Sequence, residues 1–324
     1  MDISYQVGVV VIGRNEGERL TQCILSALIE TRWVVYVDSG STDNSVASAK
    51  DLGAEVVPLD MSKPFTAARA RNAGFAKLLT LHPVDYIQFV DGDCELISGW
   101  ITSAARYLEQ HQQIAVVCGR RRERNPNTSI YNHLCDIEWN TPIGDALACG
   151  GDAMFRTKAL KHVDGFNPKL IAGEEPELCT RLRSEGWHIM RLNHEMTWHD
   201  AAILHFPQWW KRSKRAGHAF AQVSDMHPNF WQKERRSAQL WAGWIPLTLI
   251  ILSVMQPWLL TLWSLFPIQI LRIALKEKSI SQKFKVRLQY AFFVTMAKFP
   301  ELTGQIVYFS NKLRDKRATL IEYK

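Results

Sequence analysis

Polar residues gather at the points where three apolar segments of the sequence end. Asp91 and Asp93 close the run "YIQFV" with Gly92 between them, Asp38 closes "VVYV", and residues 13–16 close "VGVVVI". Two carboxylates at one strand end supply the hard oxygen ligands that Mg²⁺ or Mn²⁺ prefers, and such ions keep positions open for phosphate. The alternative is a polar turn that closes a buried strand, because Asp-Gly is also common turn chemistry.

Short β-branched runs alternate with helical patterns from residue 7 to about residue 119. We expect helices near 17–30, 42–52, 64–81 and 99–111, each lying between two apolar strands. Strands that are apolar on both sides and separated by helices predict a mostly parallel sheet with helices on both faces. Right-handed crossovers make this a doubly wound, Rossmann-like α/β sheet, whose ligands lie beyond the carboxyl ends of the strands. The three polar clusters should therefore meet at one edge of the sheet.

Several familiar site patterns are absent from the sequence. The first strand is not followed by Gly-x-Gly-x-x-Gly, and no Gly-x-x-x-x-Gly-Lys-Ser/Thr loop occurs, so neither a dinucleotide fingerprint nor a P-loop explains this edge. The six cysteines include no Cys-x-x-Cys pair, which argues against a structural zinc site or a disulfide scaffold. The first twenty residues lack the pattern of a signal peptide, and we expect a reducing, cytosolic location for the first half.

The last third of the sequence combines basic and apolar stretches. A helical pattern with aromatic and basic residues begins near residue 206, and residues 240–271 contain no charged residue but three prolines. One membrane-spanning helix takes about 20 residues, so this apolar run is too long for one helix and short for two. Basic residues flank the run on both sides, and by the positive-inside rule both ends prefer the cytoplasmic face.

We therefore expect residues 240–271 to form a bent helical hairpin that enters the bilayer and returns. Residues 288–309 are expected to form a second, more amphipathic helix in contact with the membrane. The alternative is a hairpin buried in a soluble protein, which the prolines also permit. The formal net charge of +7 suggests phospholipid or nucleic acid as a partner. Because the basic residues border an apolar hairpin rather than an aromatic platform, we expect an anionic membrane surface and no nucleic acid.

An ordered set of short motifs runs through the first two thirds of the chain: "VIGRNEGERL", "VDSGSTDNS", "ARNAGF", "FVDGDCEL", "GGDAMFR" and "GEEPELCTRLRSEGW". Together they resemble the GT-A family 2 glycosyltransferases, which are inverting enzymes that use nucleotide-diphosphate sugars. We expect a GT-A catalytic domain over residues 1–225, with nucleotide-sugar binding in 1–118 and acceptor binding in 119–225. Residues 226–324 are then a helical, membrane-associated region. The Gln-x-x-Arg-Trp signature of processive members is missing, since the nearest match is "QWWKRSKR", and this favours single addition.

The resemblance implies roles for the residues at the strand ends. Asp93 is the expected direct metal ligand, and Asp91 is expected to contact ribose or metal. The implied donor site comprises Gly13, Arg14, Asn15 and Glu16 beside the nucleotide, Asp38 accepting from the base, Arg71 near the diphosphate or the base, and Gly92 in the turn. For each of these residues the alternative is an ordinary solvated loop or helix position. Bound Mn²⁺ or Mg²⁺ would stabilise the departing diphosphate without a proton donor.

The sequence Glu174-Glu175-Pro176 begins a helix, because proline suits the first helical position. The family carries an acidic pair here, usually Glu-Asp, so Glu175 takes the place of the base that removes the acceptor's proton, with Glu177 as second choice. The alternative is a charged helix start favoured by the helix dipole. In several relatives a histidine after the acidic pair completes the metal shell, and His199 stands in that place unless it is structural.

These features predict a metal-dependent enzyme that moves a single sugar from a nucleotide-diphosphate sugar, with UDP-sugars favoured, to an acceptor. The expected acceptor is a saccharide or a lipid-linked oligosaccharide of envelope or exported polysaccharide synthesis, at the cytoplasmic face of the inner membrane. Two alternatives stay open. A nucleotidyltransferase usually needs a Gly-rich N-terminal loop with a following lysine, which "VIGRNEGERL" lacks. An inactive membrane-docked scaffold is disfavoured by the retention of Asp91, Asp93 and Glu175.

Overall fold

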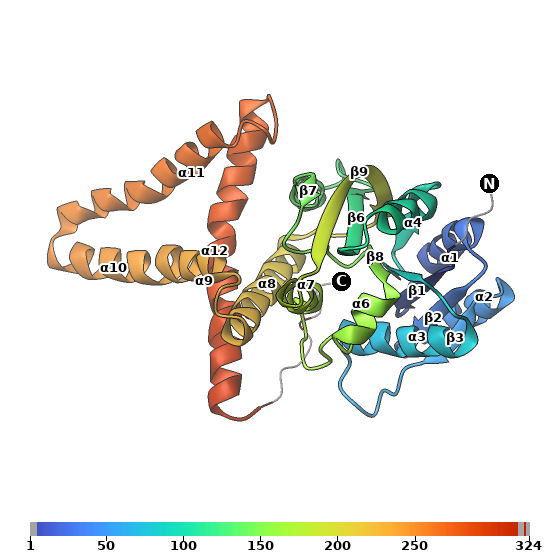
Figure 1. The fold of residues 1–324 in the computed structure, drawn as a ribbon. Coiled ribbons are helices and arrows are strands. Elements are labelled where there is room, and N and C mark those ends of the chain that lie inside the picture. The colour runs from blue at the N-terminus through green and yellow to red at the C-terminus, as the bar shows by residue number, and fades with distance from the viewer. Residues whose placement is uncertain (1–4, 317–320, 322–324) are drawn as a thin grey trace. The chain divides into compact units, whose positions relative to one another are not determined.

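The computed structural model describes residues 5–316 and 321 of the chain. The chain divides into two compact units, Met1–Leu204 and His205–Lys324 (Figure 1). The boundary expected after residue 225 falls at the end of helix α8, which belongs to the second unit. The separation of donor and acceptor halves at residue 118 stays a prediction.

Strands and helices alternate through the first unit. Its strands are β1 Val7–Gly13, β2 Val34–Asp38, β3 Glu55–Pro58, β4 Tyr86–Asp91, β5 Cys94–Leu96, β6 Ile114–Glu123, β7 Gly144–Asp145, β8 Ala153–Arg156 and β9 His188–His199. Its helices are α1 Glu18–Glu30, α2 Ser45–Asp51, α3 Ala67–Leu81, α4 Trp100–Gln110, α5 Ile130–Glu138, α6 Thr157–His162 and α7 Glu174–Ser184. The helices predicted from the sequence are confirmed, because α1 to α4 occupy the four predicted stretches and α7 begins at the acidic pair.

Within the described residues, nine strands form one sheet in the order β3-β2-β1-β4-β8-β6-β9-β5, with β7 also paired to β9. The four strands from β3 to β4 are parallel, because a helix crosses over between successive strands. The far half is mixed: β6 and β9 are parallel, whereas β8 is antiparallel to both of its neighbours and β5 is antiparallel to β9. The predicted Rossmann-like sheet is confirmed, and its antiparallel strands bring the start of β8 to the edge where β4 ends.

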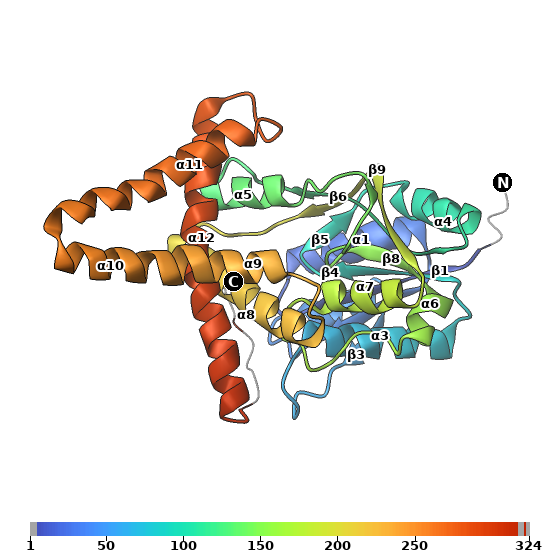
Figure 2. The same cartoon turned by 60° about the vertical axis from the view of Figure 1, so that its left-hand side comes forward.

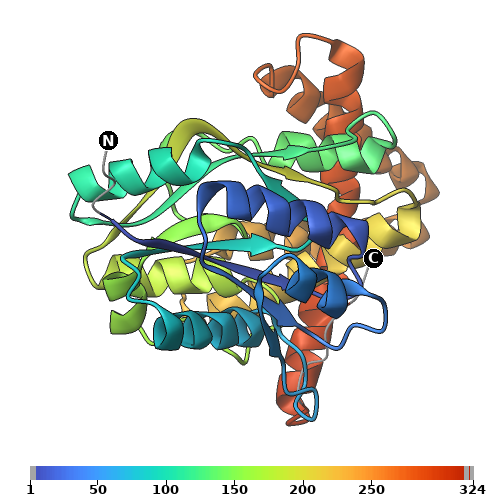
Figure 3. The ribbon, with the colours of Figure 1, turned by 90° about the vertical axis from the view of Figure 1, so that its right-hand side faces the viewer.

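Helices cover both faces of the sheet, as predicted. Figures 2 and 3 show α1 and α4 on one face, and α3 and α6 on the other. The central strand is buried on both sides, since Val9, Val10 and Val11 are all inaccessible to solvent. A Cβ at Gly74 of α3 would lie 2.3 Å from Cγ1 of Val10. Glycine at this position therefore lets α3 lie directly on β1.

The second unit is helical throughout its described elements. These are α8 Phe206–Met226, α9 Gln232–Ala238, the π-helical turn η1 Gln239–Trp244, α10 Ile245–Met255, the 3₁₀ segment η2 Pro257–Ser264, α11 Leu265–Lys276 and α12 Phe284–Leu313. The apolar run 240–271 forms two helices that meet at Gln256. Each helix is longer than its share of the run, because flanking residues extend the first back to Gln232 and the second on to Lys276. The helix predicted over 288–309 is confirmed as part of α12, and its membrane contact stays a prediction.

By length and composition, the helices Gln232–Met255 and Pro257–Lys276 could each cross a membrane, with a mean hydropathy of 1.6 in both. Only 11% and 6% of their apolar windows are buried. Large apolar side chains such as Trp244, Val254 and Trp258 are more than half exposed. The apolar surface of this hairpin thus remains uncovered within the described residues.

Helices α8 and α12 cross at two glycines. A Cβ at Gly217 of α8 would lie 2.0 Å from the carbonyl oxygen of Glu301, and a Cβ at Gly304 of α12 would lie 2.0 Å from that of Lys214. Neither backbone could yield without separating the helices. The absence of a side chain at both positions therefore sets how closely the two helices approach.

We expect Gly217→Ala to lower the melting temperature of the purified chain in detergent. The new methyl group would overlap the α12 backbone, and such overpacking costs about 1–3 kcal/mol. This exceeds the roughly 1 kcal/mol that alanine gains over glycine inside a helix. The matched control is Gly243→Ala, whose Cβ would lie 3.4 Å from its nearest neighbour, Leu302 Cδ2. Circular dichroism melts that place Gly217→Ala at or above the wild type would refute the tight crossing.

Candidate active site

The carboxyl ends of β1, β2 and β4 lie side by side. In the parallel register Gly13 is opposite Asp38, and Ile12 is opposite Asp91. The backbone N–H of Gly92 donates to the Ile12 carbonyl at 2.8 Å, which ties the turn after β4 to the end of β1. The three polar clusters recognised in the sequence therefore meet at one edge of the sheet.

The loops that follow β1 and β2 hold each other in place. The backbone N–H of Asn15 donates to Ser41 Oγ at 2.9 Å, and the Asn15 side-chain oxygen accepts the N–H of Thr42 at 2.7 Å. Asn15 has φ +55°, a left-handed conformation that asparagine tolerates better than most residues. Asp38 is buried and accepts the N–H groups of Gly40 and Ser41 at 3.0 and 3.1 Å. Both loops are thus shaped by side-chain to backbone hydrogen bonds.

The other predicted residues of this region differ in exposure. Arg14 is exposed, whereas Gly13 and Glu16 are half-buried, and Glu16 forms an ion pair with Arg19 at 2.8 Å. The expected contacts of these residues with a nucleotide, like that of Asp38 with a base, stay predictions.

Asp93 and His199 come together across the β5–β9 ladder, where Cys94 pairs with His199. The Nε2 atom of His199 lies 3.2 Å from Oδ2 of Asp93, and both side chains are largely buried. Potential ligand atoms of Asp93, Cys94 and His199 all lie within 4.8 Å of one another. Burial, together with Asp152 and Asp93, raises the pKa of the Cys94 thiol well above its usual range, so it stays a neutral thiol. The donor atoms that this group offers a divalent cation are therefore a carboxylate oxygen of Asp93 and an imidazole nitrogen of His199.

Arg71 of α3 connects the end of β4 to the start of α7. One terminal nitrogen, Nη2, lies 2.8 Å from Asp91 Oδ1 and 3.2 Å from Glu175 Oε1, and Nη1 lies 2.8 Å from Glu174 Oε1. Arg71 is only 2% exposed. Both terminal nitrogens of this buried guanidinium are therefore occupied by carboxylates of the protein itself. Its expected contact with a diphosphate or a base stays a prediction.

The charges around Arg71 do not balance, and the pKa values reflect this. Burial raises the pKa of Glu175 to about 7, with a further contribution from Glu174 and an opposing one from Arg71. Burial also raises the pKa of Asp91, again against the effect of Arg71. Burial alone would lower the pKa of Arg71, but Asp91, Glu175 and Glu174 together raise it. Arg71 therefore stays charged, while Glu175 titrates near neutral pH.

Asp152 lies beneath this cluster, immediately before β8, and is inaccessible to solvent. It accepts hydrogen bonds from the backbone N–H of Asp91 at 3.2 Å and the Thr197 hydroxyl at 2.9 Å, and it forms an ion pair with Nε of Arg121 at 2.9 Å. The ring of Trp139 covers the group, with its centroid 4.5 Å from the His199 ring and 5.5 Å from Arg121 Cζ. Asp152 thus joins β4, β6 and β9 under the site.

No sequence pattern by itself assigns a role to Arg121, Asp152 or Trp139. Asp152 lies in the motif "GGDAMFR", and this is the only signal that could have marked it. Residues 120–122 are all arginine, and their spacing cannot tell which of them faces the site. Glu177, the second choice for a base, is buried and pairs instead with Arg181 at 2.9 Å.

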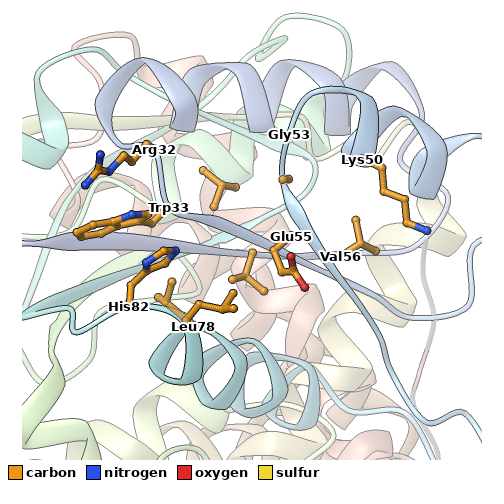
Figure 4. A pocket seen from close by; sticks show the side chains of 12 residues that line it. Arg32, Trp33, Lys50, Gly53, Glu55, Val56, Leu78 and His82 are labelled. Carbon is orange, nitrogen blue, oxygen red and sulfur yellow. The ribbon is translucent and has the colours of Figure 1, made fainter.

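A cavity of about 430 Å³ lies at the opposite, amino-terminal edge of the sheet (Figure 4). Residues at the starts of β2 and β3 and at the end of α3 line it, and the rings of Trp33 and His82 stack there with centroids 4.8 Å apart. None of the strand-end carboxylates is among its lining residues. The cavity is therefore a separate feature from the candidate active site.

We expect Glu175→Gln to melt at a higher temperature than the wild type at pH 8, with a smaller difference at pH 5. Because the folded pKa of about 7 exceeds the ordinary value of 4.5, folding favours the protonated carboxyl. That stabilisation is fully present below pH 4.5 and is lost as the pH rises through 7, whereas glutamine has no such loss. Melts in EDTA at both pH values measure the difference.

The control for this experiment is Glu177→Gln on the same helix. It removes one partner of the buried Glu177–Arg181 ion pair and should lower the melting temperature at both pH values. A lower melting temperature for Glu175→Gln than for the wild type at pH 8 would contradict the pKa assigned to Glu175.

The chain resembles known proteins in sequence over part of its length. A TPR repeat-containing protein of Synechococcus elongatus is 29% identical over 137 residues, 42% of this chain and 32% of that protein. The O-antigen chain rhamnosyltransferase RfbN of Salmonella typhimurium is 26% identical over 171 residues, 48% of this chain and 53% of that protein. The matches thus span about a third and about half of the lengths of these two curated relatives.

The fold resembles a solved structure over nearly the whole chain. The mannosyltransferase PcManGT from Pyrobaculum calidifontis superposes with a TM-score of 0.65, covering 96% of this chain and 89% of that one. At 15% identity this likeness establishes the fold, and it confirms the fold class expected from the sequence. A family model described as Glycosyl transferase family 2 matches residues 8–164, from the second residue of β1 to the loop after α6. The matched region includes Asp91, Asp93 and Asp152, so this part of the chain, just under half of its length, matches the model of glycosyl transferase family 2.

Proposed function

We propose that the protein transfers a single sugar from a nucleotide-diphosphate sugar to an acceptor hydroxyl, with inversion at the anomeric carbon. The observation that carries this proposal is the linkage made by Arg71, which holds Asp91 of β4 against Glu174 and Glu175 of α7. Asp91, which is proposed to lie on the donor side, and the candidate base thereby contact the same buried guanidinium group. The match of residues 8–164 to the family model and the convergence of the strand ends support the same chemistry.

Glu175 is the proposed general base. Its side chain is 12% exposed and lies 3.2 Å from Arg71 Nη2, and its pKa of about 7 suits proton transfer near neutral pH. The acceptor oxygen attacks the anomeric carbon while its proton passes to the Glu175 carboxylate. The bond from that carbon to the phosphate oxygen breaks, and the nucleoside diphosphate leaves with the electron pair. The engagement of Glu177 with Arg181 favours Glu175 over the second choice.

The residues fit a divalent cation. Among the described residues, the ion pairs of this site include the guanidinium groups of Arg71 and Arg121 and a larger number of carboxyl groups, those of Asp91, Asp93, Asp152, Glu174 and Glu175. An added cation would reduce this excess of negative charge. We propose that Asp93 and His199 hold Mn²⁺ or Mg²⁺, with Asp91 directed to the metal or the ribose. The bound ion would neutralise charge that develops on the departing diphosphate.

The proposed donor and acceptor are based on the loops at this edge of the sheet and on the names of the similar proteins. The loops around Asn15 and Asp38 are proposed to hold the nucleoside, with Gly13, Arg14 and Glu16 beside it. PcManGT was solved in complex with GDP-Man and Mn²⁺, and RfbN is named as an O-antigen chain rhamnosyltransferase. These names support a nucleotide-sugar donor and a saccharide acceptor, and we extend the proposal to a lipid-linked oligosaccharide of envelope or exported polysaccharide synthesis.

We expect Glu175→Gln to lower sugar transfer by about a hundredfold or more, in line with the loss of a general base. The assay measures release of nucleoside diphosphate from UDP-, GDP- and dTDP-sugars with Mn²⁺ and a membrane lipid extract, with EDTA abolishing turnover. Glu185→Gln, at the exposed far end of α7, is the matched control and should retain full activity. Near-normal turnover of Glu175→Gln would exclude it as the base. Absence of turnover in the wild type with every donor would count against a transferase.

We further propose that the apolar hairpin 232–276 inserts into the cytoplasmic leaflet of the inner membrane. Its apolar windows are largely exposed, with 11% and 6% buried, which disfavours the alternative of a core hairpin. Basic residues lie at its two ends, with Lys233, Arg235 and Arg236 at the start and Arg272 and Lys276 at the finish. Such residues favour the cytoplasmic face and an anionic lipid surface.

The double substitution Ile251→Glu and Val254→Glu should prevent the protein from floating with vesicles of anionic phospholipid in a density gradient. Both side chains are at least half exposed near the tip of the hairpin, where a charge would have to enter hydrocarbon. The control is Ile29→Glu, an apolar residue of α1 that is 76% exposed, which should float like the wild type. Recovery of the wild type in the soluble fraction would refute membrane insertion.

A further inference from the structure

Arg121 of β6 is the second arginine of the carboxylate cluster, and among the described residues its guanidinium group forms an ion pair with one acidic side chain, that of Asp152. Its Nε lies 2.9 Å from Asp152 Oδ2 in an ion pair. Asp152 is already bonded to the Asp91 backbone and to Thr197. Arg121 therefore pairs at one point rather than through the two-pronged geometry that guanidinium groups usually offer carboxylates.

The Nη2 atom of Arg121 is buried and has no hydrogen-bond partner among the described residues. It lies 3.2 Å from the position that a Cβ of Gly151 would occupy, and Asp91 Oδ2 and Arg71 Nη2 lie 2.9 and 3.0 Å from the same point. The unpartnered Nη2 of Arg121 thus lies near Asp91, at the carboxyl end of β4. A buried donor without a partner is costly, so this arrangement favours an incoming acceptor atom.

The two arginines of the cluster are in different states. Both terminal nitrogens of Arg71 contact carboxylates, whereas Nη2 of Arg121 contacts none. Asp91 Oδ1 contacts Arg71, both oxygens of Asp152 accept hydrogen bonds, and Asp91 Oδ2 is assigned to the proposed cation site. The missing acceptor is therefore expected from a ligand, and phosphate oxygens match a guanidinium group in both charge and geometry.

We propose that Arg121 binds the diphosphate of the sugar donor through Nη2, while Arg71 serves to position Asp91 and the start of α7. This inference rests on the proposed function, because it assumes a nucleotide-diphosphate donor. Arg121 then contacts the leaving group itself, on which negative charge grows as the sugar departs. The guanidinium also lies over the ring of Trp139, with Arg121 Cζ 5.5 Å from the ring centroid.

The test measures binding of inorganic pyrophosphate with Mn²⁺ by isothermal titration calorimetry on the full chain in detergent. Pyrophosphate carries no base, so the result does not depend on which nucleotide the enzyme uses. We expect Arg121→Gln to weaken binding by about tenfold or more, as expected for a lost hydrogen bond to a charged group. Arg121→Lys keeps the positive charge but loses the planar guanidinium group, and its affinity for pyrophosphate should lie between those of the wild type and Arg121→Gln. Arg122→Gln is the matched control, because the adjacent Arg122 pairs with the exposed Glu195 at 2.6 Å.

The outcomes separate this inference from the proposed function. If the wild type does not bind pyrophosphate with Mn²⁺, the proposed function fails and the inference fails with it. If the wild type binds and Arg121→Gln binds equally well, only the inference is overturned. Binding of Mn²⁺ alone, followed by electron paramagnetic resonance, should be unchanged in Arg121→Gln. A parallel loss of Mn²⁺ binding would mean that Arg121 acts only by holding Asp152 and Asp91, and would also overturn the inference.

Discussion

The buried guanidinium of Arg71 is the contact on which the geometry of the site depends. It is bonded on one side to Asp91, at the end of a central strand, and on the other to Glu174 and Glu175, at the start of α7. These elements are far apart in the chain, and α7 is a helix outside the sheet that contains β4. A buried arginine that lost its partners would carry a large desolvation cost, so the strand end and the helix start must stay together. The separation between Asp91 and the two glutamates is thereby set by one side chain.

The antiparallel direction of β8 matters as much as the parallel sheet that precedes it. In the β4–β8 ladder Phe89 is opposite Ala153, so Asp152, just before β8, reaches the same edge as Asp91. In a parallel pairing Asp152 would lie at the amino-terminal edge instead. The β6–β9 ladder completes the arrangement, because it sets Arg121 opposite Thr197 and both bind Asp152. One buried carboxylate thus contacts a residue from each of three strands, through two hydrogen bonds and one ion pair.

The site contains an excess of buried negative charge, and its free-energy cost must be offset by the rest of the first unit. Carboxyl groups outnumber guanidinium groups, and burial holds the pKa of Glu175 near 7 and raises that of Asp91. Such groups reduce the stability of the fold at neutral pH, and the apolar sheet, buried on both faces, provides the compensating free energy. The excess negative charge and the unpartnered Nη2 of Arg121 are both suited to ligands that bring a cation and phosphate together.

The sequence by itself determined the alternation of strands and helices, the meeting of the polar clusters at one edge and the helical character of the apolar run. These features depend on local patterns, namely β-branched runs, glycine turns and the spacing of apolar residues, which act over a few residues. It also marked Asp91, Asp93, Glu175 and His199 as candidates, because they lie in recognisable motifs.

Only the tertiary structure decided which side chains meet. Arg71 was expected near a diphosphate or a base, yet the fold surrounds it with three carboxylates; Arg121 lies among three consecutive arginines, and only the register of β6 against β9 turns it toward Asp152. The partners of both residues come from strands and helices that are distant in sequence. Such pairings depend on strand order and direction, and a local pattern contains no information about either.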